Sequence, residues 1–183
     1  MLNALRLLGQ DLREKSRLAG RGEDLGSVAR TLVGDGSLSM VLYRLMQGAR
    51  ESHLGPLEMV LNKMNSVYGN CIIGRGTDFG PGFVLFHSDG VVINGKVKGG
   101  SSVRLQHQVT IGANEQGECP VLGSDIIIGA GAKIIGPITI GDGARIGANA
   151  VVVHDVAPNT TVVGIPAKPV KRRDRSDNGA GSA

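Results

Sequence analysis

Aromatic side chains are scarce in this chain, whose 183 residues include three Phe, two Tyr and no Trp. Globular cores normally draw much of their buried area from aromatic rings. Hydrophobic residues still make up 41% of the chain, and glycine contributes 29 residues. The core must therefore be built from Val, Ile, Leu and Ala in a narrow space, which favours a repetitive, tightly wound architecture over a sandwich or a doubly wound sheet.

Cysteines and long apolar runs are also lacking. Cys71 and Cys119 are too few for a disulfide framework in a chain of this size. No apolar run approaches the about 20 residues that a membrane-spanning helix needs. The first residues, MLNALRLLGQDLREK, carry charges throughout and lack the apolar core of a signal peptide. We therefore expect a cytoplasmic protein without a membrane span.

Positive charge is in modest excess, with a net charge of +4 and a sequence pI of about 9.3. The excess gathers near the C-terminus, at Lys168, Lys171, Arg172, Arg173 and Arg175. Such a cluster suits a polyanion, a membrane surface or a phosphate-rich cofactor, and it also fits a solvated tail. Residues 171–183, KRRDRSDNGAGSA, are predicted to be a disordered basic tail.

Residues 1–68 show helical spacing and form the first predicted region. Apolar side chains recur at three- and four-residue steps at Leu5, Leu8 and Leu12, and again at Val41 and Leu45. The stretch 54–68 is a further helical candidate, with a proline near its start. The pattern predicts an N-terminal region of two to four helices.

Residues 69–170 repeat every six residues instead. The aliphatic or aromatic positions of the first run are Ile73, Phe79, Leu85, Val91, Val97, Val103 and Val109, and those of the second are Leu122, Ile128, Ile134, Ile140, Ile146 and Val152. Each six-residue unit provides one short strand and a turn, and three units make an 18-residue triangular coil. Because a single coil cannot bury its inner face alone, the coils must stack. Known β-helices with this six-residue repeat wind left-handed. The chain is therefore predicted to be mainly β, a left-handed parallel β-helix with an N-terminal α-helical region.

The two runs are out of phase by one residue, and the break falls in residues 113–121, ANEQGECPV. This segment is polar, contains Gly117 and Pro120, and has no six-residue pattern. A loop extruded from the β-helix explains both observations, and such loops often carry function.

Several phrases resemble the serine acetyltransferase group of hexapeptide acyltransferases. They are FGPGFVLFHSDGVVIN, VTIG, IGAGAKIIGPITIGDGARIGANAVVV and VVGIPAK, which together span about residues 68–171. The phrases HSDGVVIN from His87, HQVTIG from His107 and the pair Cys119-Pro120 are similar to short members that acetylate saccharides, such as colanic-acid-type acetyltransferases. VLYR, at residues 41–44, adds weaker support. The resemblance implies an acetyl-CoA-dependent O-acetyltransferase.

The chain also departs from the serine acetyltransferase pattern. Phe86 stands where the resemblance has an Asp before its catalytic His, and Ile72 stands where it has the Asp that orients this His. Glu118 and Cys119 replace an Arg-His pair, across a shortened loop. Most contacts to the carboxylate of serine are therefore missing, which favours a saccharide or a polysaccharide precursor as the acceptor. Serine, the acceptor in cysteine biosynthesis, or another small hydroxyl compound is the alternative.

Acetyl transfer to a hydroxyl needs a base, and neutral histidine suits this role near pH 7. His87 matches the base of the resembled family, and His107 is the second candidate. Asp89 lies 18 residues before His107, so an 18-residue coil would stack the two about 4.8 Å apart, as a carboxylate–imidazole pair. Alternatively, Asp89 orients His87 across a subunit boundary, or the stack is an exposed ladder of charges.

For acetyl-CoA, the resemblance implies contacts at small residues one coil apart. Ala130 and Ala148 match these positions, Gly112 matches a backbone position near the thioester, and Lys168 could meet the phosphates of coenzyme A. The same residues also suit simple packing of the coils. The resemblance further implies a homotrimer, with the active sites between adjacent prisms, or a hexamer of paired trimers. No nucleic-acid partner is expected.

Two other functions are compatible with a hexapeptide β-helix. A γ-type carbonic anhydrase needs three imidazole ligands for zinc. The chain has four histidines, at His53, His87, His107 and His154, and only two of them lie in the relevant coils, so no metal is expected. The other function is that of a trimeric scaffold without catalysis. The retained His87 and the extruded loop argue against it.

Overall fold

The computed structural model describes residues 1–170, so the predicted disordered tail lies outside the described residues. Four helices come first: α1 (Leu2–Leu18), α2 (Leu25–Thr31), α3 (Ser37–Glu51) and α4 (Gly55–Tyr68). Residues typical of helix N-termini begin two of these helices. The Asp24 carboxylate caps α2 by accepting a hydrogen bond from the Ser27 amide at 3.0 Å. Pro56 occupies the first turn of α4. The predicted helical region is confirmed, and it has four helices.

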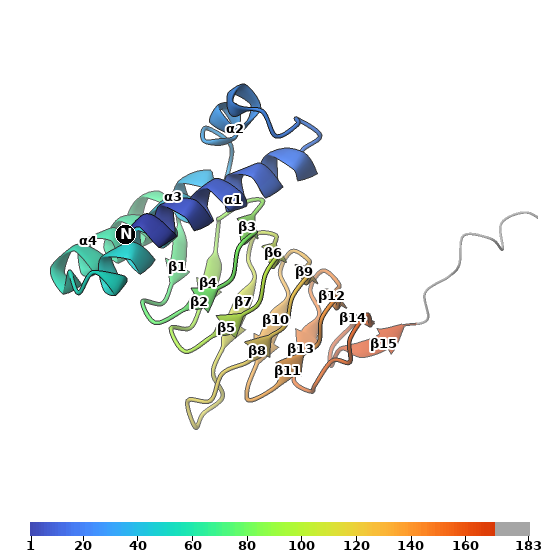
Figure 1. Cartoon of the computed structure of the whole chain (residues 1–183). Helices are drawn as coiled ribbons and strands as arrows, with labels where there is room; N and C mark the ends of the chain where they lie inside the picture. The colour runs from blue at the N-terminus through green and yellow to red at the C-terminus, as the bar shows by residue number, and fades with distance from the viewer. Residues whose placement is uncertain (171–183) are drawn as a thin grey trace, which may run out of the picture.

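Fifteen short strands follow, wound into a three-sided prism (Figure 1). Their bounds are β1 (Cys71–Ile73), β2 (Asp78–Phe79), β3 (Val84–Leu85), β4 (Val91–Ile93), β5 (Lys98–Gly99), β6 (Arg104–Leu105), β7 (Thr110–Gly112), β8 (Val121–Leu122), β9 (Ile127–Ile128), β10 (Lys133–Ile135), β11 (Thr139–Ile140), β12 (Arg145–Ile146), β13 (Val151–Val152), β14 (Thr161–Val163) and β15 (Lys168–Val170). The sheets run β1-β4-β7-β10-β13, β2-β5-β8-β11 and β3-β6-β9-β12-β14-β15. All pairs are parallel except β14 with β15. The predicted left-handed parallel β-helix is confirmed.

The core consists of stacked aliphatic side chains, as the six-residue repeat predicted. One ladder runs through equivalent positions of successive coils, at Ile73, Ile93, Ile111, Ile134 and Val152, and each of these residues is at most 2% exposed. Small residues such as Ala132 and Ala144 are fully buried beside such ladders. The few aromatic side chains are concentrated where the prism meets the helices, since Tyr43 on α3 packs there against Phe79 and Phe83 of the first coil.

The spacing of the coils differs from a uniform 18 residues. Cys71 pairs with Val91, twenty residues later, because the first coil has two extra residues at the corner around His87. Thr110 pairs with Lys133, a step of 23 residues that includes the loop between β7 and β8. The predicted phase of the first run was therefore wrong by two residues after Leu85. Ile93, rather than Val91, continues the ladder that starts at Ile73.

The loop between β7 and β8 projects from the prism (Figure 1). Asn114 closes it, because its side chain accepts a hydrogen bond from the Glu118 amide at 2.9 Å and donates one to the Glu118 carboxylate at 2.9 Å. Lys96 fixes the tip of the loop to the second coil by donating to the Gly117 carbonyl at 3.0 Å.

The helices cover the first-coil end of the prism (Figure 1). A buried ion pair within the helical region forms hydrogen bonds to the first coil. Arg44 on α3 donates to the Asp11 carboxylate on α1 at 2.6 Å, and both side chains are fully buried. Arg44 also donates to the carbonyls of Phe79 and Gly80, while Asp11 accepts from the amides of Gly82 and Phe83. Each charge is thus hydrogen-bonded to the first coil, which fixes the helices on the prism. No helix within residues 1–170 is long and apolar enough to span a membrane.

Candidate active site

His87 lies at the corner of the prism that follows β3, and its imidazole faces a carboxylate from the helical region. The His87 Nδ1 atom lies 3.2 Å from Asp35 Oδ2, and the two side chains are 49% and 80% exposed. A carboxylate in this position holds the neutral imidazole with its proton on Nδ1. The lone pair on Nε2 is then free to accept a proton from an acceptor hydroxyl.

A close approach of two backbones brings Asp35 to His87. Asp35 belongs to the short connection between α2 and α3, and the next residue, Gly36, has a φ of +73°. A Cβ on Gly36 would lie only 2.6 Å from the carbonyl oxygen of Leu85, two residues before His87. Only glycine allows both this conformation and this contact. The connection is fixed from its other side by Lys15 on α1, whose amine donates to the Asp35 carbonyl and to the Ser37 hydroxyl.

His107, the second predicted base, lies in the next coil beside His87. Leu85 pairs with Leu105 in register, so the two histidines occupy equivalent positions. Their ring centroids are 6.0 Å apart, with an angle of 74° between the planes. The structure thus brings together the two imidazoles that the sequence singled out. We call the stacked turns that hold them, residues 86–90, 106–108, 129–131 and 147–149, the histidine corner.

Asp89 does not form the predicted pair with His107. Its main chain is in the predicted place, because the Asp89 carbonyl accepts from the Gln108 amide, one residue beyond His107, at 2.8 Å. The Asp89 carboxylate instead accepts a hydrogen bond from Asn70 at 3.2 Å. The side chain of Asp89 is thus bound to Asn70, which precedes the first strand, and not to His107. The carboxylate partner of His87 within this chain is Asp35, which sequence analysis missed.

Ala130 and Ala148 extend the histidine corner by two coils. The Gly131 amide donates to His107, and the Asn149 amide donates to Ala130, so the three turns lie one above another. Within residues 1–170, the amide N–H groups of Ala130 and Ala148 donate to no backbone carbonyl. A corner with short side chains and free amides fits an extended arm that carries its own carbonyl groups, such as pantetheine. These two residues would hold that arm.

The other two candidates for binding coenzyme A lie elsewhere on the prism. Gly112 ends β7, on the far side of that strand from His107. Lys168 begins β15, which pairs antiparallel with β14 at the end of the prism. Lys168 pairs with Val163, whose side chain packs over Gly147 of the histidine corner. Lys168 therefore lies near the last coil of this corner, where the phosphates at one end of a long ligand would reach it.

Two cavities flank the Asp35–His87 pair. One, of about 380 Å³, is lined by Lys15, Leu18, Ala19, Arg21, Thr31, Gly34, Asp35, Phe86 and His87. We call it the α1 cavity. The other, of about 470 Å³, lies on the opposite side of Asp35 and includes Tyr68, Asn70, Ser88 and Asp89. A small acceptor in the α1 cavity would have both the imidazole of His87 and the carboxylate of Asp35 within reach, whereas the larger cavity is lined by carboxylates and by no histidine.

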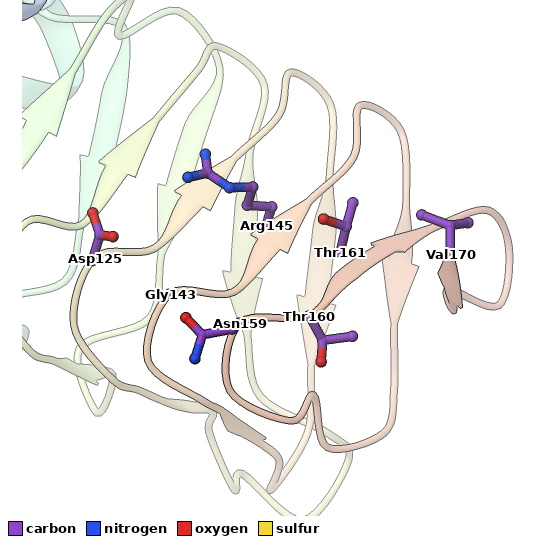
Figure 2. Close-up of a pocket in the computed structure, with 7 residues that line it drawn as sticks. All are labelled: Asp125, Gly143, Arg145, Asn159, Thr160, Thr161 and Val170. Carbon is purple, nitrogen blue, oxygen red and sulfur yellow. The ribbon is translucent and has the colours of Figure 1, made fainter. Parts of the chain in front are cut away.

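A further hollow lies at a different corner, between the sheets that contain β11 and β12. Its volume is about 240 Å³, and Asp125, Gly143, Arg145, Asn159, Thr160, Thr161 and Val170 line it (Figure 2). Figure 2 shows its polar side chains coming from successive turns of the prism. No histidine lines this hollow, so it lacks the imidazole base that the sequence predicted. Among the described residues, no three His, Cys, Asp or Glu side chains gather in a way that could hold a metal ion.

Comparisons with protein families, with other proteins and with solved structures identify relatives of this chain. The family model "Bacterial transferase hexapeptide (six repeats)" matches residues 119–154. The serine acetyltransferase of Helicobacter pylori strain J99 is 33% identical over 144 residues, which cover 77% of this chain and 84% of that enzyme. The chain belongs to the serine acetyltransferase family. It is accordingly an acyltransferase. A serine acetyltransferase solved in complex with CoA has a TM-score of 0.81 and 26% identity, and the match covers 91% of this chain and 69% of that one.

Two more members of the serine acetyltransferase family illustrate the extent of the similarity. The enzyme of Mycobacterium tuberculosis is 42% identical over 113 residues, which cover 57% of this chain but only about half, 49%, of the relative. The solved structure of the Neisseria gonorrhoeae enzyme in complex with serine has a TM-score of 0.82 and 31% identity, and the match covers 92% of this chain and 70% of that one. The resemblance stated from the sequence is thus confirmed for the family.

Proposed function

We propose that this chain transfers the acetyl group of acetyl-CoA to the hydroxyl of L-serine. The observation that carries the proposal is the Asp35–His87 pair, which opens onto the α1 cavity in a member of the serine acetyltransferase family. Serine as the acceptor is supported by the relatives, which are named serine acetyltransferases and one of which is solved with serine. The sequence analysis had placed serine second, after a saccharide.

In the proposed reaction, Asp35 holds the imidazole of His87 with Nε2 free. His87 Nε2 takes the proton from the serine hydroxyl as its oxygen bonds to the acetyl carbon. The imidazolium then returns that proton to the departing sulfur, so O-acetylserine and free coenzyme A are the products. General-base catalysis of this kind contributes about 10²–10⁴-fold to the rate. The donor supplies an activated thioester, and Ala130, Ala148, Gly112 and Lys168 are proposed to bind it.

We also propose that the chain works as a homotrimer. The histidine corner is exposed along one side, where Ala148 and Asn149 reach solvent. A neighbouring prism against this corner would enclose the thioester. Sedimentation analysis of the purified protein checks this: a single species of about 57 kDa, three times the mass of the 19.0-kDa chain, supports it, and a monomer contradicts it.

A saccharide hydroxyl is the second candidate acceptor, and specific residues favour it. Phe86, Glu118 and Cys119 stand where the resemblance has residues that contact serine, and the larger cavity beside Asp35 carries the exposed ring of Tyr68 and the side chain of Asn70. An aromatic face with nearby hydrogen-bonding groups suits a sugar ring.

Release of free thiol from acetyl-CoA tests these proposals directly. The purified protein is incubated with acetyl-CoA and with L-serine, simple sugars or nucleotide sugars in parallel. Turnover with serine and not with sugars supports the serine proposal. Turnover with sugars alone moves the acceptor to the saccharide branch. If no acceptor is turned over and calorimetry detects no acetyl-CoA binding, the catalytic assignment fails.

A further inference from the structure

We propose that Lys15 and Arg21 form a subsite for the carboxylate of the acceptor. The inference rests on the proposed acetyl transfer, which it deepens by naming the acidic class of acceptor. Both residues line the α1 cavity, together with the proposed base, His87. The residues that replace the Arg-His pair of the resembled family, Glu118 and Cys119, bring no positive charge. The helical region supplies that charge instead.

Lys15 has an unusual position for a lysine. It lies in the last turn of α1 and is only 7% exposed, yet no carboxylate oxygen lies within 4 Å of its amine among residues 1–170. Its Nζ donates to the Ser37 hydroxyl at 3.0 Å and to the Asp35 carbonyl, both neutral acceptors. An ammonium group has three donors, so one remains for a ligand in the cavity. A nearly buried cation whose hydrogen-bond partners are both neutral is costly, and the charge of Asp35 offsets only part of the effect of burial on Lys15. An anion bound in the cavity would compensate for the remaining charge.

Arg21 adds a second positive charge to the same cavity. It follows the C-terminal end of α1 and is exposed, and its guanidinium makes no ion pair or side-chain hydrogen bond among the described residues. The charge of Arg21 is close enough to lower the pKa of Lys15, in addition to the larger effect of burial. Two cations that repel each other at one site are stabilised together by a shared anion. A guanidinium fork also matches the two oxygens of a carboxylate.

The cavity therefore offers three kinds of group around one small volume. His87 is the base for a hydroxyl, the Asp35 carboxylate suits an ammonium group, and Lys15 with Arg21 suits a carboxylate. Serine carries all three complementary groups. A uronic acid carries the hydroxyl and the carboxylate without the ammonium. The chemistry common to both ligands is a carboxylate close to the hydroxyl that is acetylated.

Binding tests the subsite independently of turnover. NMR of the full chain, labelled with ¹⁵N, follows the Arg21 Nε–H signal during titration with pairs of ligands that differ in the acidic group: L-serine against serinol, and glucuronate against glucose. We expect a saturable shift with at least one acid and about tenfold weaker binding of its neutral partner. Equal affinities within each pair, or no shift with either acid, would overturn the subsite.

Matched variants link the preference to the two cations. Arg21→Gln and Lys15→Met should each reduce the preference for the acid over its neutral partner by about tenfold. The ratio is the readout because Lys15→Met can also disturb Asp35, which would affect both ligands equally. Arg6→Gln removes the same charge from the distant half of α1 and should leave the ratio unchanged. A preference that survives both cavity variants contradicts the assignment.

Failure of the subsite and failure of the proposed function give different results. If serine and serinol are acetylated equally well, the protein acetylates a small hydroxyl compound, but the carboxylate subsite is wrong. If serine is not acetylated, whereas glucuronate binds or reacts in preference to glucose, the serine proposal is wrong and the subsite stands.

Discussion

The helical region and the prism differ in how they are built and in what each contributes to the site. In the prism, every coil repeats the same construction, with Ile73, Ile93 and Ile111 stacked and fully buried. In the helical region nothing repeats, and buried or half-enclosed charges such as Asp11, Lys15 and Arg44 are prominent. The repeat forms a rigid scaffold that holds histidines and small residues at equivalent positions on successive coils. The helices bring charge to that scaffold, and the candidate site exists only where the two meet.

The largest effect is expected from removing the base that the prism provides. His87→Ala should lower kcat/KM by about 10²–10⁴-fold, because His87 is the only imidazole among the residues that line the α1 cavity. The fold should persist, since the His87 side chain is half exposed. Thiol release measures the loss, and circular dichroism with sedimentation checks the assembly. Full activity in this variant would contradict the role of His87.

A smaller loss of activity is expected from removing the carboxylate that the helical region provides. Asp35→Asn should lower kcat/KM by about 10–100-fold, because an amide no longer holds the imidazole as a charge-assisted partner. Asp89→Asn is the matched control, since the Asp89 carboxylate accepts from Asn70 and not from a histidine. We expect less than about a threefold change for that variant. If Asp89→Asn causes the larger loss, the original prediction that Asp89 serves catalysis is the better one.

The contact between the helical region and the prism can also be disturbed by adding one methyl group. Gly36→Ala places a Cβ 2.6 Å from the Leu85 carbonyl oxygen in a residue with φ of +73°. The connection must shift, so we expect about 1–3 kcal/mol lower stability and about a tenfold loss of activity as Asp35 moves away from His87. Urea unfolding and thiol release measure the two effects. Gly9→Ala, in the middle of α1 with no atom within 4 Å of the new Cβ, should instead stabilise the protein by about 0.5–1 kcal/mol.

The smallest expected effect is a dependence on pH. Burial, together with the neighbouring charge of Arg21 and against that of Asp35, lowers the pKa of Lys15 to about 8. Lys15 is charged below this pH and neutral above it, so the preference for serine over serinol should fall as pH rises through about 8. The groups facing its amine are Asp35, Ser37 and Arg21, and His87 lines the same cavity. Measuring kcat/KM for both acceptors between pH 7 and pH 9.5 gives the preference as a ratio, in which any change in the base step cancels because the base acts on both acceptors. A ratio that does not change with pH would remove Lys15 from the subsite.

Most of the prism could be predicted from the sequence, because its rules are local. A six-residue repeat predicts which side chains point inward. The break in that repeat predicted the loop between β7 and β8. The phase error after Leu85 shows the limit of this reasoning. Two extra residues in a turn do not interrupt a run of Val and Leu, so the printed sequence continues to look regular where the structure is not.

The helical contribution to the site could not be predicted, because it is tertiary. Asp35 lies between two glycines in a short connection, and its sequence carries no motif for catalysis. Its role depends on the contact of Gly36 with Leu85, which lies far away along the chain. Lys15 likewise has the spacing of an ordinary helical residue. His87 and His107 were found because a resemblance pointed to them, whereas Asp35 was found because of where the fold places it.

The most direct test of the account is a double-mutant cycle on the Asp35–His87 pair. It compares kcat/KM for thiol release in the native chain, Asp35→Asn, His87→Ala and the double variant. If Asp35 acts through His87, the double variant should be no slower than His87→Ala alone, because the carboxylate has no imidazole left to hold. If the two losses instead multiply, Asp35 and His87 act independently, and the claim that the helices and the prism share one catalytic unit is wrong.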